Sequence, residues 1–313
     1  MIKKITIFII LVISAIALNT VRSPRKETKN PLFSEERVLL GTFVKVISPS
    51  DKAAEIAFRE IERIEGLLSK YKPESEVYRL NKTGKIKASP ETFFIIKRAK
   101  EFYALSNGAF DITLGPLVDL WGFTEKNYRV PHKKDLNKAL NLVGSDKIIL
   151  REEDNVIQFL LPGMKIDLGA IAKGYAVDCA IEKLKKSGIK DCLINAGGQV
   201  YCLGKNYSKP WRVSIRNPGG GKKNNILELR DKAVSTSGIY EQNFIKESTV
   251  YGHIINPKTG MPVENSLLSV TIVTGNSLDA DALSTAIFIL GGKTKALTAA
   301  FKDTQAIIIK KIR

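Results

Sequence analysis

Apolar residues recur every three to four positions between residues 172 and 184, which predicts an amphipathic helix with one buried face. The residues of that face are Ala172, Ala176, Cys179, Ala180 and Leu184. A short apolar strand end at 164–168 precedes the helix and carries one acid, Asp167, before a Gly-Ala turn. Gly188 is a suitable C-terminal stop, and lysines near that end suit the negative pole of the helix dipole. We expect a candidate site to be built around this strand, turn and helix.

The same patterns predict further helices and many short strands in the rest of the chain. Helices are expected from Asp51, as N-cap, to about Lys70; at a short segment capped by Ser75; from Ser89, as N-cap before Pro90, to about Ser106; from Pro131 to about Val143; from a cap at Ser277 or Asp279 to Leu290; and from Lys293 to Phe301. Strands are expected at 36–47, 147–150, 155–161, 192–198, 199–204, 211–218, 226–229, 232–238, 253–257, 267–275 and 305–312. Strands gathered into meanders with helices between them indicate an α+β fold rather than a doubly wound sheet.

The N-terminus has a pattern of its own. Two lysines precede an apolar run at residues 5–18, which is shorter than the roughly 20 residues of a comfortable membrane span. Small residues near the end of the run suit cleavage by a signal peptidase. We therefore expect a signal peptide or signal anchor at 1–18, a polar tether at 19–33, and one domain at 34–313.

The composition narrows the possible function classes. With 313 residues and 44% hydrophobic content the chain can bury a sizeable core, and its 26% charged residues do not indicate general disorder. The net charge of +17 comes from basic residues spread along the chain, without the concentrated patch that nucleic-acid binding requires. A solvated, lysine-rich surface is the simpler interpretation, and attraction to anionic lipid or to a polyanionic ligand is the alternative.

The three cysteines give no metal-binding spacing, and their number is odd. Cys192 and Cys202 flank a Gly-Gly turn and could pair across neighbouring strands in an oxidising compartment. Together with Cys179, they are more simply interpreted as small buried residues.

Lys173 lies in the first turn of the central helix, where free N–H groups and the helix dipole favour negative charge. A cation there, beside a glycine that lets the backbone approach closely, suits a bound phosphate. The alternative is a lysine that leans into water over an ordinary strand–turn–helix unit. This segment alone leaves both interpretations open.

A second polar group lies on the late helix, where Asp281 and Thr285 are four residues apart and share a face. Carboxylate and hydroxyl oxygens suit a hard cation such as Mg²⁺, whereas an acid that only complements a helix N-terminus is the alternative. His253 precedes a turn at Asn256-Pro257. A lone histidine between apolar residues is usually structural, but one close to a phosphate site could move protons.

Nine segments of the chain together resemble one known family. In order they are LGTFVKV, SEVYRLN, GAFDITLGPLVDLWGF, KIDLGAIAKGYAVD, NAGG, WRVSIRNP, STSGIYEQNF, HIINPKTG and DADALSTAIFILG, and they cover most of residues 36–292. The chain thereby resembles flavin transferases of the ApbE type, the FAD:protein FMN transferases. The resemblance implies an α+β, T-fold-like architecture of antiparallel sheets with flanking helices that binds FAD and Mg²⁺. It also implies transfer of FMN from FAD to a threonine hydroxyl of a partner flavoprotein, with release of AMP.

The resemblance also implies roles for single residues. Cofactor contacts are implied for Leu40, Tyr71, Ala109, Phe110, Asp111, Asp167, Lys173 and Ile255. Metal ligation is implied for the Ala170 carbonyl, Asp281 and Thr285, with Ser284 close by, and His253 stands at a catalytic position. Two residues depart from the family pattern: Leu40 stands where the family usually has Met, and Asn256 where it usually has Asp, which removes a charge beside His253.

The acceptors that the resemblance implies are flavoprotein subunits of membrane redox complexes or exported electron-transfer proteins. The expected location is therefore the periplasm or the outer face of the inner membrane. Two other functions stay open from the sequence: an FAD pyrophosphatase that yields FMN and AMP, and a non-enzymatic envelope protein that binds flavin. The combination of Asp281 and Thr285 with Asp167 and Lys173 argues against a simple carrier. The chain lacks the family's acceptor pattern, an Asp followed a few residues later by Ser/Thr-Gly-Ala-Thr, so self-modification is not indicated.

Overall fold

The structure is a computed structural model that describes residues 31–218, 225–239, 243–293 and 295–311. Its contacts group Leu32–Arg313 into one compact unit. The expected signal segment at 1–18 and nearly all of the expected tether lie outside the described residues, although Phe33 already belongs to the first strand. Within the described part of the chain, no helix has both the length and the apolarity that crossing a membrane requires.

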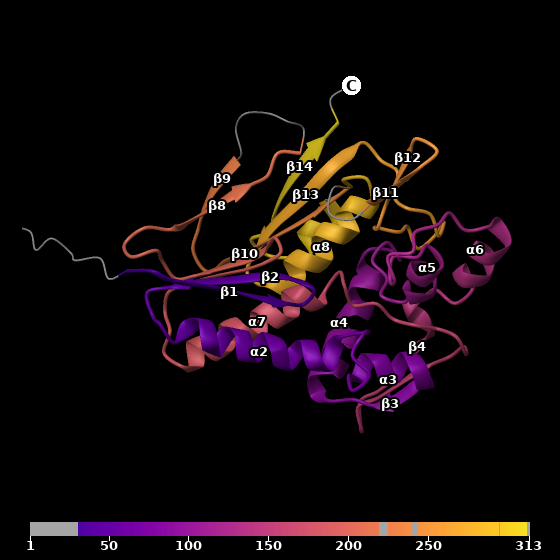
Figure 1. The fold of residues 1–313 in the computed structure, drawn as a ribbon, viewed down its shortest axis with the longest axis horizontal. Coiled ribbons are helices and arrows are strands. Elements are labelled where there is room, and N and C mark those ends of the chain that lie inside the picture. Colours follow the sequence, from indigo (N-terminus) through magenta and orange to yellow (C-terminus); the bar gives the residue numbers. More distant parts are fainter. Residues whose placement is uncertain (1–30, 219–224, 240–242, 294, 312–313) are drawn as a thin grey trace, which may run out of the picture. The chain divides into compact units, whose positions relative to one another are not determined.

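A seven-stranded sheet, in which all neighbouring strands are antiparallel, forms the centre of the fold (Figure 1). From one edge to the other its strands are β1 (Phe33–Leu39), β2 (Thr42–Ser48), β6 (Cys192–Ala196), β7 (Gln199–Leu203), β10 (Lys232–Gly238), β13 (Leu267–Thr274) and β14 (Gln305–Lys310). In β2 the inward side chains of Val44 and Val46 alternate with exposed neighbours, as expected for a strand with one covered face. The sheet and the helices beside it confirm the expected α+β class.

Among the described residues, three smaller antiparallel sheets accompany the central one. They are β3 (Lys85–Lys87) with β5 (Val156–Phe159) and β4 (Ile148–Arg151); β8 (Trp211–Ile215) with β9 (Asn225–Leu229); and β11 (Asn243–Lys246) with β12 (Thr249–Gly252).

The helices that the structure describes are α2 (Ala53–Leu68), α3 (Glu76–Thr83), α4 (Pro90–Leu105), α5 (Gly115–Leu120), α6 (Lys133–Leu140), α7 (Ala172–Lys186), α8 (Ser277–Ile289) and α9 (Lys295–Ala299). Helix α7 packs against both α2 and α8, and α8 also packs on β10 and β13 (Figure 1). Buried side chains from these elements share one apolar core, including Phe58, Ile61, Ala180, Leu184, Ala286 and Ile287. This core fixes α7 and α8, the two helices with the candidate site residues, against each other.

Local signals account for several helix ends. Ser75 and Ser89 are the N-caps of α3 and α4, accepting from the N–H groups of Tyr78 and Thr92 at 3.0 and 3.3 Å, which confirms both predicted caps. Gly188 has φ +79°, the left-handed conformation expected just after a helix, and α7 ends two residues earlier.

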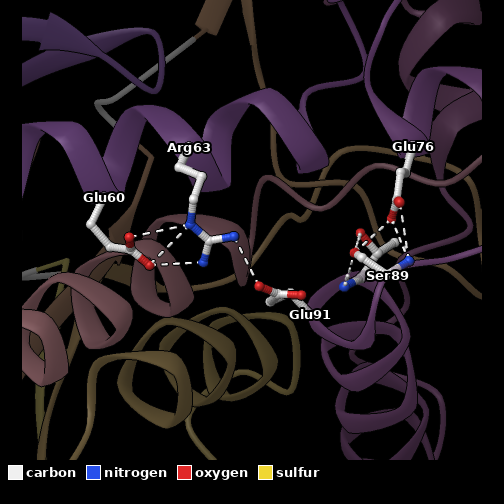
Figure 2. Close-up of polar contacts among 6 residues, drawn as sticks. Glu60, Arg63, Glu76, Ser89 and Glu91 are labelled. Carbon is white, nitrogen blue, oxygen red and sulfur yellow. Dashed lines mark hydrogen bonds and ion pairs between the residues drawn. The ribbon is translucent and has the colours of Figure 1, made fainter.

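Ion pairs and hydrogen bonds join α2, α3 and α4 (Figure 2). Arg63 contacts Glu60 of its own helix and Glu91 of α4, each at 2.8 Å. The buried carboxylate of Glu76 in α3 accepts from the Ser89 N–H at 3.0 Å and from the Ser89 hydroxyl at 2.8 Å. These contacts hold α2 and α3 against the start of α4, and the chain enters two segments of the candidate site after the C-terminal ends of α2 and α4.

Two predicted strands are wrong in the structure. The expected strand end at 164–168 has no strand partner, because the Asn81 side chain accepts from the Ile166 N–H at 2.7 Å and donates to its carbonyl at 2.9 Å. The expected strand at 253–257 is reduced to one bridge between Ile255 and Pro262, since Asn256 closes a turn by accepting from the Gly260 N–H at 2.8 Å.

Two predicted caps and one predicted strand are also corrected. The N-cap of α2 is Lys52, without a side-chain cap, rather than Asp51. The N-cap of α8 is Asn276, whose side chain accepts from the Asp279 N–H at 2.8 Å. The single strand expected at 36–47 is the β1–β2 hairpin, in which Leu40 and Gly41 turn with φ values of 55° and 69°.

The three cysteines are free thiols. Cys192 and Cys202 are buried, but they lie opposite Leu203 and Leu193 and so project from opposite faces of the sheet. Cys179 is half-buried on α7. The cross-strand disulfide that the sequence left open is therefore not formed, and two of the three are the small buried residues expected.

Candidate functional site

The turn before α7 is organised by Asp167. Its backbone N–H donates to the Ile112 carbonyl at 2.7 Å, which ties this turn to the 109–123 segment. One carboxylate oxygen, Oδ1, accepts from the Gly169 N–H at 2.8 Å, and the other, Oδ2, lies 2.8 Å from Lys70 Nζ. Asp167 thus stabilises the turn that precedes α7 with one carboxylate oxygen and forms an ion pair with Lys70 through the other.

Lys70 is a site residue that our sequence analysis did not single out. It directly follows the end of α2, donates to the Thr124 hydroxyl at 3.1 Å, and lies 5.0 Å from the centre of the Tyr71 ring. Burial lowers the pKa of Lys70, but the Asp167 carboxylate outweighs this effect and leaves the pKa raised. Burial likewise raises the pKa of Asp167, but Lys70 outweighs it and holds that pKa below its usual range.

Lys173 folds back over the first turn of α7 instead of leaning into water. Its Nζ donates to the Gly169 carbonyl at 3.0 Å, and the residue is half-buried. Its positive charge acts on both Asp167 and Asp281, lowering the pKa of each. The charge at this helix N-terminus therefore acts on two carboxylates that are far apart in the sequence.

Asp281 of α8 joins the two candidate half-sites. It is 4% exposed, and its Oδ2 accepts from the Gly174 N–H of α7 at 3.0 Å. Burial raises the pKa of Asp281, and the Lys173 charge and the Gly174 N–H oppose this rise only in part. A buried carboxylate with a raised pKa is stabilised by any cation that binds beside it.

Hydroxyl groups surround the α8 part of the site. The Ser237 hydroxyl lies 2.8 Å from that of Ser284 and 3.1 Å from that of Thr285. Ser284 is fully buried and also contacts the Asp281 carbonyl at 2.9 Å. Thr285 is only half-buried, so its hydroxyl is the more accessible of the two.

The chemistry of these donors fits a magnesium ion. One buried carboxylate, the Thr285 and Ser284 hydroxyls, and the Ala170 carbonyl in the turn before α7 are all hard oxygen donors of the kind Mg²⁺ prefers. In the described part of the chain, no three His, Cys, Asp or Glu residues gather around a potential metal position. A single carboxylate supplemented by neutral oxygens suits an ion that keeps several waters and binds substrate phosphates.

Asp111 borders a cavity of about 310 Å³. Its Oδ1 accepts from the Thr113 N–H and hydroxyl at 2.8 and 2.7 Å and from the Ser145 hydroxyl at 2.7 Å, whereas its buried Oδ2 has no protein partner. Burial raises the pKa of Asp111 despite these bonds. Tyr103 and Lys258 also line the cavity. Less than 1 Å² of the Oδ2 surface is exposed, so this oxygen is enclosed by the protein, and the cofactor contact predicted for Asp111 stays a prediction.

The neighbours of Asp111 are less accessible. Ala109 is buried, and the ring of Phe110 packs on Phe102 in the core, with 5.6 Å between their centres. Ile255 is also a core residue, 1% exposed, in a cluster with Leu117 and Trp121. The side chains of these three predicted cofactor residues are therefore turned into the protein, which leaves their backbone atoms for any contact.

The other predicted site residues lie on turns. Leu40 is half-buried at the β1–β2 turn, and Tyr71 is 61% exposed beside Lys70. His253 is half-buried and directly follows β12. The cofactor and catalytic roles of these residues stay predictions.

Aromatic packing anchors the β11–β12 hairpin that leads to His253. Phe244 stacks on Tyr128 and on Tyr251, with ring centres 5.2 and 5.1 Å apart. Trp121 lies 5.5 Å from Tyr251, and its indole N–H donates to the Gly260 carbonyl at 2.8 Å. The aromatic run at 109–123 thus fixes both the hairpin and the turn that follows His253.

The family model of the ApbE family matches residues 40–308 of this chain. The FAD:protein FMN transferase of Klebsiella pneumoniae (strain 342) is 33% identical over 292 residues, which cover 91% of each chain. The FAD:protein FMN transferase of Treponema pallidum (strain Nichols) is 33% identical over 304 residues, which cover 88% of this chain and 84% of the relative.

Solved structures give the same result. The crystal structure of the ApbE protein from Thermotoga maritima superposes with a TM-score of 0.81 at 32% identity, covering 89% of this chain and 94% of that one. The flavin transferase ApbE from Vibrio cholerae superposes with a TM-score of 0.79 at 28% identity, covering 90% and 94%. Sequence and fold match over most of the chain, and the chain belongs to the ApbE family.

Proposed function

We propose that this protein is an FAD:protein FMN transferase that requires Mg²⁺ and attaches FMN to a threonine hydroxyl of a partner flavoprotein. The observation that carries the proposal is the hydrogen bond between the Gly174 N–H and the Asp281 carboxylate. It brings the cationic start of α7 together with the oxygen donors of α8. The relatives named FAD:protein FMN transferase, which match over most of their length, support the same activity.

The residues at the start of α7 suit a dinucleotide with a pyrophosphate. Lys173 lies over the first helical turn, where backbone N–H groups and the dipole favour an anion. Lys70 supplies a second cation on the far side of Asp167.

The ion would be held by Asp281 and Thr285 from α8 and by the Ala170 carbonyl from the turn before α7. Magnesium, when bound, would withdraw the negative charge that develops on the leaving AMP. Ser237 supports the Thr285 hydroxyl directly, and Ser284 does so through its hydrogen bond with Ser237. The role of the chain is to hold phosphates, ion and nucleophile in line, which is the main requirement of phosphoryl transfer.

The reaction forms one phosphoester bond and breaks one phosphoanhydride bond. The threonine oxygen of the acceptor attacks the phosphorus of the FMN half of FAD, the bond to AMP breaks, and the threonine proton moves to a base. His253 is the base that we propose, because it lies between the β11–β12 hairpin and the turn that Trp121 holds at Gly260, and an imidazole nitrogen can accept a proton. Attack by water in place of the threonine would give FMN and AMP.

The acceptors that we propose are exported flavoproteins, such as subunits of membrane redox complexes. The apolar run at residues 5–18, led by two lysines, supports export to the periplasm or to the outer face of the inner membrane.

The test incubates the full chain with FAD, MgCl₂ and a carrier protein that bears the acceptor pattern, an Asp followed a few residues later by Ser/Thr-Gly-Ala-Thr. We expect in-gel flavin fluorescence on the carrier, and none on a matched carrier in which the final Thr is Ala. Free FMN and AMP without a labelled carrier would show that the protein is an FAD hydrolase and not a transferase. Bound, uncleaved FAD in the presence of Mg²⁺ would show that the protein binds flavin without acting as an enzyme on it.

A further inference from the structure

Helices α7 and α8 exchange carboxylate-to-backbone hydrogen bonds in both directions. Asp281 of α8 accepts from the Gly174 N–H of α7 at 3.0 Å. One turn further along α7, Asp178 accepts from the N–H groups of Ser277 and Leu278 at 2.7 and 2.8 Å. Gly174 and Asp178 are four residues apart on α7, and Ser277 and Asp281 are four apart on α8. The two contacts are therefore a matched antiparallel pair.

The N-terminus of α8 is fully used by these and neighbouring contacts. Its first two N–H groups donate to Asp178, the Asp279 N–H donates to the Asn276 side chain at 2.8 Å, and the Ala280 N–H donates to the Asn276 carbonyl at 3.3 Å. The positive pole of α8 is thus already occupied by an internal anion, Asp178. A phosphate of the substrate would not bind to these N–H groups.

The separation of the two helices is fixed at the same place. A Cβ atom on Gly174 would lie 2.3 Å from the Ser277 carbonyl oxygen, so the backbones touch without an intervening side chain. The Gln199 amide of β7 donates to the same Ser277 carbonyl at 3.0 Å. Both the N–H and the carbonyl of Ser277 are therefore held, and α8 has one register on α7.

We propose that Asp178 is a positioning residue that sets α8 on α7, so that the donors of α8 meet those of the turn before α7. The inference rests on the proposed function, since it concerns the same Mg²⁺ site. Asp178 donates no atom to that site; it acts through Asp281, which lies at the other end of the paired contact. Loosening Asp178 therefore weakens metal binding although every metal-binding residue is retained.

The test compares Asp178→Asn with Asp279→Asn in the full chain. Both changes remove one negative charge from the N-terminal region of α8, but the Asp279 carboxylate pairs with Arg98 and Asn276 rather than with α7. In the Asp178→Asn variant the side-chain amide has a single acceptor oxygen, so one of the two bonds to α8 is lost. The readouts are Mg²⁺ binding by titration calorimetry, thermal stability, and FAD affinity measured without Mg²⁺.

We expect Asp178→Asn to raise the Mg²⁺ dissociation constant about 10-fold, the usual scale for a group that orients a metal ligand. Asp279→Asn should change the Mg²⁺ dissociation constant less than about 2-fold, although it loses a similar amount of thermal stability. The affinity for FAD measured without Mg²⁺ should stay the same in both variants. Equal Mg²⁺ affinities for the two variants would overturn the inference. A wild-type protein that transfers FMN without Mg²⁺ would instead overturn the proposed function, so the two failures are distinguishable.

Discussion

Replacing Gly174 by alanine tests the contact on which the candidate site depends. The new Cβ would lie 2.3 Å from the Ser277 carbonyl oxygen, 2.7 Å from its carbonyl carbon and 2.8 Å from the Leu278 Cα. All three are backbone atoms of α8, so no side chain can rotate to make room. Restoring an ordinary contact of about 3.4 Å requires α7 and α8 to separate by roughly 1 Å, because close-packed interiors have no slack to absorb the methyl group.

Two effects set the expected size of the change. Overpacking of this kind costs about 1–3 kcal/mol, and the better helix propensity of alanine offsets about 1 kcal/mol of it. We therefore expect the free energy of unfolding to fall by up to about 2 kcal/mol. The effect on activity should be larger, since a displacement near 1 Å between catalytic groups can reduce the rate about 100-fold.

The control is Gly66→Ala in α2, where a Cβ has open space around it and φ is not in the left-handed region. That change should leave FMN transfer unaltered and stabilise the protein by up to about 1 kcal/mol. Urea denaturation and initial rates of FMN transfer measure both proteins. If Gly174→Ala retained wild-type stability and rate, the close α7–α8 contact would not exist in solution.

Three further changes test other parts of the site. Lys70→Met removes the cation beside Asp167, and urea denaturation at pH 7 should show a loss of about 2 kcal/mol, below the range of about 3–5 kcal/mol for a fully buried pair, because these side chains are 12% and 22% exposed. The pKa of Asp167 in the folded protein lies below its ordinary 3.8, so the pair stabilises the protein above about pH 4. The difference in unfolding free energy between wild type and Lys70→Met should therefore shrink as the pH falls through the folded pKa of Asp167. A difference that does not change with pH would argue against the pair. Asp281→Ala should abolish FMN transfer and the thermal stabilisation by Mg²⁺, and an unchanged rate would remove Asp281 from the metal site. Phe244→Ala should speed hydrogen exchange across 243–252 and slow FMN transfer. Ile245→Ala should do neither, because the Ile245 side chain is 69% exposed. Equal hydrogen exchange in both variants would show that the aromatic cluster does not hold the hairpin.

Local sequence signals predicted the helices of this fold best. The spacing of apolar residues at 172–184 and the glycine at 188 define α7 without reference to any other segment. The prediction of a strand at 164–168 failed because the Asn81 side chain, and not a neighbouring strand, binds the N–H and the carbonyl of Ile166. No local pattern distinguishes that partner from a neighbouring strand.

The candidate site was harder to predict because its parts meet only through tertiary packing. Family motifs pointed to Asp167 and Asp281, but the sequence alone does not show that α7 and α8 exchange hydrogen bonds over 107 residues. Lys70 was missed because its partner lies 97 residues away and nothing beside it in the chain marks it as buried. Asp178 was missed for the same reason: it resembles any acid on a helix until Ser277 is placed against it.

The ratio of AMP released to FMN attached tests the proposed reaction most directly. The full chain is incubated with FAD, Mg²⁺ and the carrier protein with the acceptor sequence, AMP and free FMN are quantified by chromatography, and attached FMN by intact mass. If this protein transfers FMN to threonine, AMP and attached FMN appear in equal amounts and no free FMN accumulates. Equal amounts of AMP and free FMN, with the mass of the carrier unchanged, would contradict the account.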